Sequence, residues 1–446
     1  MGQAAALPNA KPPSGEFVSA EGSTNAAIPH NERAIFPLVP RSVHGAGSML
    51  RNAQQMGDPP SARKGLPSFL SKENGVKAWV ALLLGLALCV TARAENGVTN
   101  DTILIGRSAG MTGSLAARMK PATEAIEAYF AAVNAAGGVN GRRLKLVNLD
   151  DGNDPKRAAE NTRKLVDEDK VFVMFANSGT AQTAAALKVL SERRVPLIGT
   201  TSGADSMQAF DPLVFHYKAS YGRELKRIAE YMKTVGIDNV AVVYSPDPTG
   251  VEGKQLAEAA LKAQGITPRA VVATKPEELG PFLQSTAKAP PQAIVLTALA
   301  APGAGFFKEL VQLQNRPQVF SWSVAGVEAI HKEVGEKVRG LVVSQVFPPP
   351  HSQSVRVSID YQKLMAQAKL PNGGYPGMEG YVSARVLMEG LKRAGRDLTR
   401  ERLTAALRSM HDVDIGNDDV SFGPNDHVGR DFVELTIVGP DGKFLR

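Results

Sequence analysis

The chain has 446 residues, of which 43% are hydrophobic and 21% charged, which is ordinary for a globular protein and sufficient for two or three domains. The formal net charge is +7, but residues 1–94 hold nine Lys/Arg and five Asp/Glu, leaving 42 against 39 in the rest. No basic tract could follow a phosphate backbone, so we expect no nucleic-acid partner. Cys89 is the single cysteine of the chain. The residues after it therefore cannot form a disulfide or a cysteine metal site or supply a thiol nucleophile.

Residues 1–70 are rich in Pro, Gly, Ala, Ser and Asn and show no sustained hydrophobic periodicity. Such a segment buries too little apolar surface to offset its chain entropy. We therefore predict a disordered extension or, because Met49 and Met56 are alternative starts, a wrongly assigned start codon.

Residues 71–94 have the order of parts of a secretory signal peptide. Lys72 and Lys77 precede the apolar run Ala78–Val90, and the segment ends in Ala-Arg-Ala at Ala94. An apolar run of this length is shorter than the roughly 20 residues that a membrane span needs. We expect cleavage after Ala94 and export to the periplasm; a buried core helix is the alternative.

Short apolar runs alternate with amphipathic stretches through the rest of the chain. The runs predict strands at 103–105, 144–149, 171–175, 195–199, 240–244, 269–274, 293–297, 319–322, 341–345 and 432–438. The amphipathic stretches predict helices at 122–136, 155–167, 180–193, 224–235, 250–264, 277–288, 303–314, 378–394 and 400–410. Strands that are apolar on both faces are typical of parallel sheets covered by helices, and about 350 residues exceed one core. We predict an α/β protein with two doubly wound, Rossmann-like lobes.

Several segments together resemble a known family. Val133–Arg142 reads VNAAGGVNGR and is followed by Asp150-Asp151 and Asp154-Pro155; later come VPLI at 195–198, EGY at 379–381 and DGKF at 441–444. In this order they resemble the leucine/isoleucine/valine-binding family of periplasmic binding proteins, which has the type I fold. The resemblance covers Val98–Arg446.

The resemblance implies three crossover strands between the lobes, which we expect near Tyr217–Ser220, Gln345–Pro350 and Asp419–Pro424. The first lobe would comprise 98–218 plus 350–420, and the second 219–347 plus 424–446. It also implies a monomer without cofactor that captures an amino acid or a related small carboxylate or amide. The lobes would close on this solute, and the closed form would dock on the membrane subunits of an ABC importer, which uses the ATP.

In open α/β sheets, ligands bind beyond the carboxyl ends of the strands, where helix N-termini offer free N–H groups. By position the resemblance indicates the solute-binding residues Ser178, Gly179, Thr180, Thr201, Ser202 and Gly203 in the first lobe. In the second lobe it indicates Tyr221, Thr249, Ala298 and Ser323. Helix capping by Ser and Thr, and a plain core role for Tyr221, are the alternatives.

One departure from the family concerns the solute's charge. Branched-chain amino-acid binders place an acid on the second lobe beside the ammonium group, but here the matching stretch, 321–326, contains no acid before Glu328. A buried ammonium without a carboxylate is costly, so an aromatic or aliphatic acid, an amide or a urea-like solute stays open. Glu379 is a substitute, although an acid of the first helical turn explains it more simply.

An enzyme and a receptor subunit are the two alternative classes of function. The one Gly-x-Ser-x-Gly string, Gly106–Gly110, lacks the immediate helix of a nucleophile elbow, because we expect the next helix only near Ala122. No metal-ligand spacing is present, so we expect neither catalytic residues nor a metal site. A soluble ligand-sensing subunit of a signalling receptor on the same fold stays open.

Overall fold

The computed structural model describes residues 95–416 and 419–445. The predictions for residues 1–70 and for the signal peptide at 71–94, with cleavage after Ala94, lie outside the described residues. Among the described residues, no helix is both long and apolar enough for a membrane crossing.

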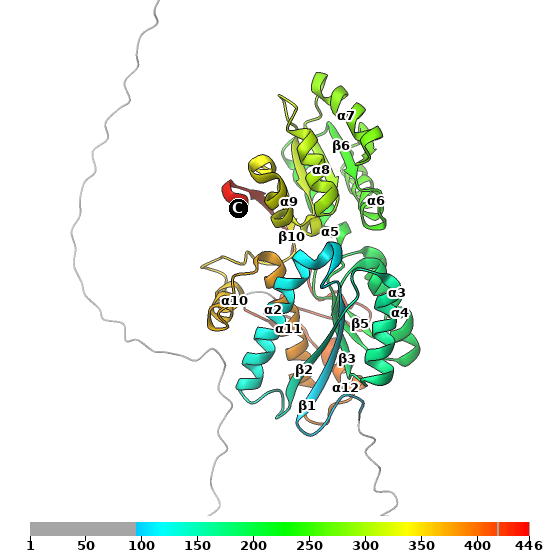
Figure 1. The fold of residues 1–446 in the computed structure, drawn as a ribbon, viewed down its shortest axis with the longest axis vertical. Helices are drawn as coiled ribbons and strands as arrows, with labels where there is room; N and C mark the ends of the chain where they lie inside the picture. The colour runs from blue at the N-terminus through cyan, green and yellow to red at the C-terminus, as the bar shows by residue number, and fades with distance from the viewer. Residues whose placement is uncertain (1–94, 417–418, 446) are drawn as a thin grey trace, which may run out of the picture. The chain divides into compact units, whose positions relative to one another are not determined.

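The first lobe is built on a parallel sheet with the strand order β2-β1-β3-β4-β5. The strands are β1 (Thr102–Ala109), β2 (Arg143–Asp150), β3 (Val173–Asn177), β4 (Leu197–Thr200) and β5 (Val214–Phe215). Figure 1 shows α2 and α11 together on one side of this sheet and α3 and α4 on the other. The lobe's helices are α2 (Ala116–Ala135), α3 (Pro155–Arg163), α4 (Thr180–Arg193), α10 (Arg356–Gln367), α11 (Gly374–Ala394) and α12 (Arg400–Arg408).

The second lobe is built on a sheet with the order β14-β13-β10-β9-β8-β6-β7, parallel except at β13 and β14. Its strands are β6 (Val240–Tyr244), β7 (Ala270–Ala273), β8 (Ala293–Thr297), β9 (Gln318–Ser321), β10 (Val342–Gln345), β13 (Glu434–Val438) and β14 (Phe444–Leu445). Its helices are α5 (Tyr221–Thr234), α6 (Pro248–Ala263), α7 (Pro276–Lys288), α8 (Ala300–Leu310) and α9 (Val327–Val334).

Each lobe has its own hydrophobic core. All five residues of β3 and of β8 are buried, as expected for strands that are covered by helices on both faces. One cluster of buried side chains lies between the second sheet and its helices, and separate clusters surround the first sheet. The chain passes between the sheets after β5, after β10 and before β13. The α/β fold class with two lobes is thus confirmed, whereas the exact residue limits of the lobes stay a prediction.

The start of α2 was predicted wrongly. The helix begins at Ala116, directly after a 3-10 turn at Gly113–Leu115, and not near Ala122. Pro121 lies inside α2 and does not end the helix. A proline at this position removes one hydrogen bond to the preceding turn and crowds that turn, so the helix continues here at a local cost. The helices α9 and α10 were not predicted.

The first and third crossings are joined beside a buried histidine. His216 donates its backbone N–H to the carbonyl of His427 at 2.7 Å, and Gly429 donates to the carbonyl of His216 at 2.8 Å. The His216 side chain is only 3% exposed, and neither ring nitrogen has a hydrogen-bond partner among the described residues. Burial, which disfavours the charged ring, lowers the pKa of His216 to about 4.

This histidine makes the stability of the fold depend on pH. The unfolded chain takes up a proton near pH 6.5 but the native ring only near pH 4, so the free energy of unfolding falls as the pH drops through this window. We expect a loss of about 2 to 3 kcal/mol from this group by pH 4.5. Urea unfolding at pH 7 and 4.5 should therefore show a smaller pH dependence for His216→Gln than for the wild type. His411→Gln, at an exposed histidine, serves as the control and should leave the pH dependence unchanged.

Candidate functional site

A cavity of about 670 Å³ is lined by residues of both lobes. Its first-lobe wall contains residues from the start of α2, the N-terminus of α4 and the loop after β4, and its second-lobe wall residues that follow β6, β8 and β9. Most of these segments lie beyond the carboxyl ends of parallel strands, where open α/β sheets bind ligands. The cavity is therefore the candidate site.

The N-terminus of α4 faces this cavity through Gly179 and Thr180. Gly179 is the N-cap and supplies no side-chain cap to the first turn. Its φ of 78° lies in the left-handed region, and a Cβ there would come within 2.1 Å of Gln182 Oε1, so the turn requires glycine. The hydroxyl oxygens of Thr180 and Ser202 lie 2.7 Å apart. Two hydroxyls and a helix N-terminus thus form one polar corner of the cavity.

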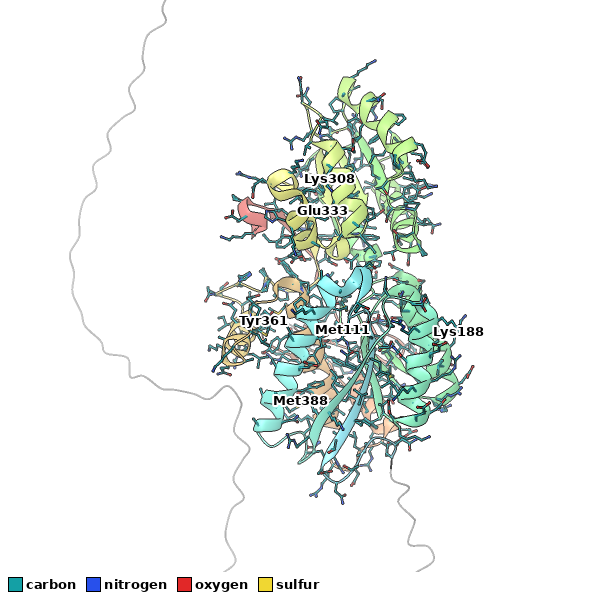
Figure 2. The ribbon with its side chains drawn as sticks, viewed as in Figure 1. Met111, Lys188, Lys308, Glu333, Tyr361 and Met388 are labelled. Carbon is teal, nitrogen blue, oxygen red and sulfur yellow. The ribbon has the colours of Figure 1, made fainter. Side chains whose placement is uncertain are left out.

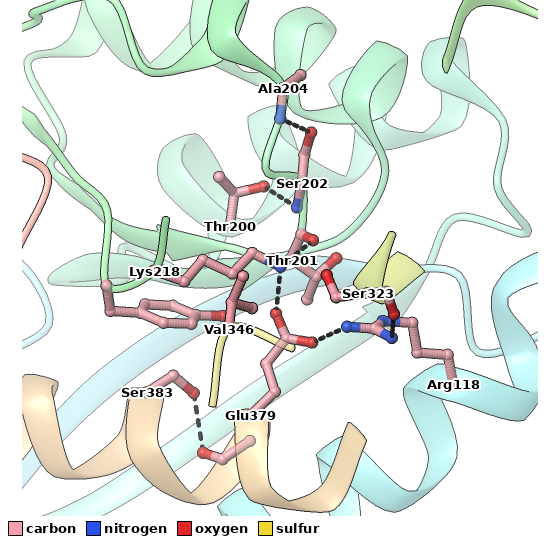
Figure 3. Close-up of polar contacts among 12 residues, drawn as sticks. Arg118, Thr200, Thr201, Ser202, Ala204, Lys218, Ser323, Val346, Glu379 and Ser383 are labelled. Atoms are coloured by element: carbon pink, nitrogen blue, oxygen red, sulfur yellow. Dashed lines mark hydrogen bonds and ion pairs between the residues drawn. The ribbon is translucent and has the colours of Figure 1, made fainter. Parts of the chain in front are cut away.

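The loop after β4 is held by hydrogen bonds from its backbone N–H groups to the hydroxyls of Thr200 and Ser202 (Figure 3). Ser202 donates its N–H to Thr200 Oγ1 at 3.1 Å, and Ser202 Oγ accepts from the N–H of Ala204 at 3.2 Å. Thr201 donates its N–H to the carbonyl of Asn177 at 2.9 Å. These bonds fix Thr201 and Ser202 in the cavity wall.

Tyr221 lines the cavity and also belongs to the core. Its ring lies 4.8 Å from the ring of Trp322 and is almost fully buried. Gly203 makes room for it, because a Cβ at this position would lie 2.7 Å from the Tyr221 ring. Thr249 also lines the cavity, in the first turn of α6, beside the N-cap Asp247.

Four predicted residues do not line the cavity. The hydroxyl of buried Ser178 accepts the N–H of Gly110 at 2.8 Å, and Gly203 lies beneath the Tyr221 ring. The buried Ala298 offers its carbonyl to Trp322 Nε1, and Ser323 donates its N–H and its hydroxyl to Glu224. These groups form contacts within the protein. They therefore support the residues that line the cavity but do not line it themselves.

A buried ionic cluster, formed by Arg118, Lys218 and Glu379, lies against this wall (Figure 3). Lys218 Nζ lies 2.6 Å from Glu379 Oε1 and donates to the carbonyl of Thr201, also at 2.6 Å. Arg118 bonds the other oxygen of Glu379. The side chains of Glu379 and Lys218 are 1% and 2% exposed, and that of Arg118, which lines the cavity, is 14% exposed.

The cluster keeps Glu379 ionised. Burial alone would raise the pKa of this carboxyl, but the charges of Arg118 and Lys218 hold it below its usual range. Burial lowers the pKa of Lys218, and the carboxylate of Glu379 opposes that shift. The interpretation of Glu379 as an acid of the first helical turn was wrong, because α11 begins at Gly374 and places Glu379 beyond that turn. No sequence signal joins Lys218 to Glu379; Lys218 lies within the crossover expected at Tyr217–Ser220, and its charge there is the one hint.

Two side chains that the sequence left unassigned also reach the cavity. Arg118 lies in the part of α2 that was not predicted, and Glu328 in the unpredicted helix α9. Glu328 Oε1 lies 3.1 Å from where a Cβ would stand on Gly374, at the start of α11 in the first lobe. Glu333 also lines the cavity but pairs with Lys308 of α8, as Figure 2 shows.

The serine of the Gly-x-Ser-x-Gly string is engaged inside the first lobe. Ser108 is buried and donates its hydroxyl to Asp151 at 2.9 Å, and Asp150 holds the loop that follows by accepting the N–H groups of Met111 and Thr112. Across residues 95–416 and 419–445, no group of three His, Cys, Asp or Glu side chains is placed to hold a metal ion.

Neutralising Glu379 tests the ionic cluster. Glu379→Gln would leave two buried cations without a carboxylate, and we expect the free energy of unfolding to fall by about 3–5 kcal/mol. Lys218→Met should cost less, because Arg118 and Glu379 then remain a balanced pair. Urea unfolding measures both. Glu389→Gln is the matched control on α11, since the Glu389–Arg393 pair lies near the surface and should contribute at most about 1 kcal/mol. An equal loss for Lys218→Met and Glu379→Gln would contradict this account.

Comparison with known proteins places the chain in a family. A family model described as "Periplasmic binding protein" matches residues 102–439. The Leu/Ile/Val-binding protein homolog 2 of Brucella abortus is 36% identical over 102 residues, which cover 23% of this chain and only 27% of that protein.

Two solved structures resemble the whole fold. A substrate-binding periplasmic protein from Ralstonia solanacearum is 30% identical, with a TM-score of 0.70 over 77% of this chain and 99% of the other. An extracellular ligand-binding receptor from Verminephrobacter eiseniae is 26% identical, with a TM-score of 0.71 over 77% of this chain and 100% of the other. The chain therefore belongs to the periplasmic binding protein family, with the type I fold.

Proposed function

We propose that this protein is the periplasmic solute-binding component of an ABC importer and captures an amino acid or a related small carboxylate or amide. The observation that carries the proposal is the cavity of about 670 Å³ between loops of both lobes, a volume in the range of small-molecule sites. The family membership and the name of the Brucella abortus relative support the same role.

The walls of the cavity suit a small amphiphilic molecule. Thr180, Ser202 and the free N–H groups at the start of α4 offer donors to a carboxylate or an amide oxygen. Leu115, Leu299 and Val324 offer apolar surface for an aliphatic or aromatic part. Tyr221 closes one side with its ring.

Glu328 supplies an acid on the second-lobe side of the cavity. The sequence shows no acid in the stretch 321–326, but α9 brings the carboxylate of Glu328 to the cavity. An ammonium group bound from the second lobe would therefore have a partner, which keeps amino acids among the candidate solutes.

Contacts between the lobes fit closure around the solute. Arg118 of the first lobe reaches the carbonyl of Ser323 in the second at 3.4 Å, and Ser206 donates its hydroxyl to Glu252 of α6 at 3.3 Å. We propose that the three crossings act as the hinge and that the importer's membrane subunits dock on the closed form. Pull-down with those subunits, rather than with a sensor kinase, would separate the importer from the sensing role.

A thermal-shift screen tests the binding role. We expect at least one member of a panel of amino acids, aromatic and aliphatic acids, and amides to raise the melting temperature, because a ligand that binds only the native state stabilises it. Mass spectrometry should recover this solute unchanged after incubation. A panel without any stabilising member, or recovery of a converted product, would refute the proposal.

The polar corner makes a sharper prediction. The double variant Thr180→Ala, Ser202→Ala should weaken binding of that solute by about 1–3 kcal/mol, because two hydrogen-bonding groups are lost. Isothermal titration calorimetry measures the change. Ser178→Ala is the matched control, since that hydroxyl bonds Gly110 behind the wall and should change affinity little.

A further inference from the structure

We infer that Arg118 receives a carboxylate of the solute, so that the site selects organic acids, amino acids included, over the corresponding amides. The inference rests on the proposed function and narrows its solute class. It follows from the charge of the buried cluster and from the donors of Arg118.

Within the cluster itself, two cations are paired directly with only one carboxylate. Arg118 and Lys218 share one carboxylate, that of Glu379, and all three side chains are largely buried. Glu224, another buried carboxylate near this point, offsets part of the charge of Lys218, but its hydrogen bonds come from Ser323 and Ser344 and not from Arg118. A buried excess charge is costly unless an opposite charge reaches it. Of the three side chains, that of Arg118 is the most exposed, and it lines the cavity.

Arg118 has donors left for a ligand. A guanidinium has five N–H donors. One amino nitrogen of Arg118 bonds Glu379, and the other makes only a long contact of 3.4 Å with the carbonyl of Ser323. Its Nε has no hydrogen-bond partner among the described residues. Glu379 thus holds a planar fork in place in the wall, and such a fork matches the two oxygens of a carboxylate.

No other cation competes for this role. Among the described residues that line the cavity, Arg118 is the single Lys, Arg or His. Of the acids, Asp247 caps α6 and Glu333 pairs with Lys308, so Glu328 remains to face a cationic group. A solute with a carboxylate at Arg118 and an ammonium group at Glu328 would pair with a charged side chain on each side of the cavity.

Matched acid and amide probes test the inference. Binding of L-leucine and L-leucinamide, 4-methylpentanoate and 4-methylpentanamide, and benzoate and benzamide is measured by calorimetry on the whole protein. We expect at least one acid to bind, and each acid that binds to do so at least tenfold more tightly than its amide. Arg118→Gln should weaken acid binding roughly 10- to 100-fold, the range of charge-assisted hydrogen bonds, and change amide binding less than about threefold.

Two further variants separate binding from folding. Arg118→Gln leaves Lys218 and Glu379 as a balanced pair, and an unchanged circular dichroism spectrum should confirm that it folds. Arg118→Lys keeps the charge but loses the planar fork. Its affinity for acids should lie between the affinities of the wild type and of Arg118→Gln. Arg316→Gln removes an equal charge at an exposed position outside the cavity and should bind as the wild type does.

The outcomes distinguish this inference from the proposed function. Acid binding that survives in Arg118→Gln, or amides that bind the wild type as tightly as acids, would overturn the role of Arg118 and leave solute capture standing. Arg118 would then serve only as a contact between the lobes. A wild type that binds none of the six probes would overturn the inference and count against the proposed function as well.

Discussion

The carboxylate of Glu379 is the constraint on which much of the first lobe depends. It is almost completely buried on α11, and it meets Arg118 from the start of α2 and Lys218 from the first crossing between the lobes. Three segments far apart in the sequence are joined at one point, and Lys218 extends the join to Thr201 in the loop after β4. The cluster therefore fixes the position of the crossing, of one wall of the cavity and of two packed helices together.

The second lobe has a comparable point in Glu224. This carboxylate on α5 accepts from Ser323 after β9 and from Ser344 on β10, so it fixes the ends of two strands beside the crossings. Burial raises the pKa of Glu224, and its hydrogen bonds with these serines oppose the rise. In each lobe, donors from different helices, strands and loops thus form hydrogen bonds with one buried carboxylate. Loops that form the site are held in place by these two sets of hydrogen bonds.

Local patterns were sufficient for most of the fold. The limits of β6, β8 and α4 agree with the sequence prediction, because each is an apolar run or a periodic stretch bounded by turn residues. For the site, the family resemblance indicated Thr180, Ser202 and Tyr221, and all three line the cavity. Ser178 and Ser323, indicated in the same way, do not line the cavity, because local position does not tell which way a side chain turns. The pairing of Lys218 with Glu379 joins residues 161 positions apart, and no local pattern encodes it.

Arg118 belongs both to the ionic cluster and to the wall of the cavity, which limits how specificity can change over evolution. A substitution there alters which solutes are recognised and, at the same time, how well the interior is electrostatically balanced. Few substitutions at this position can therefore lead to recognition of a neutral solute. Replacement of Arg118 by a neutral residue is tolerable because Lys218 and Glu379 remain a balanced pair. Replacement by an acidic residue would require a second change in the cluster. New selectivity is more accessible from the second-lobe wall, where Thr249 and Leu299 line the cavity without taking part in this balance.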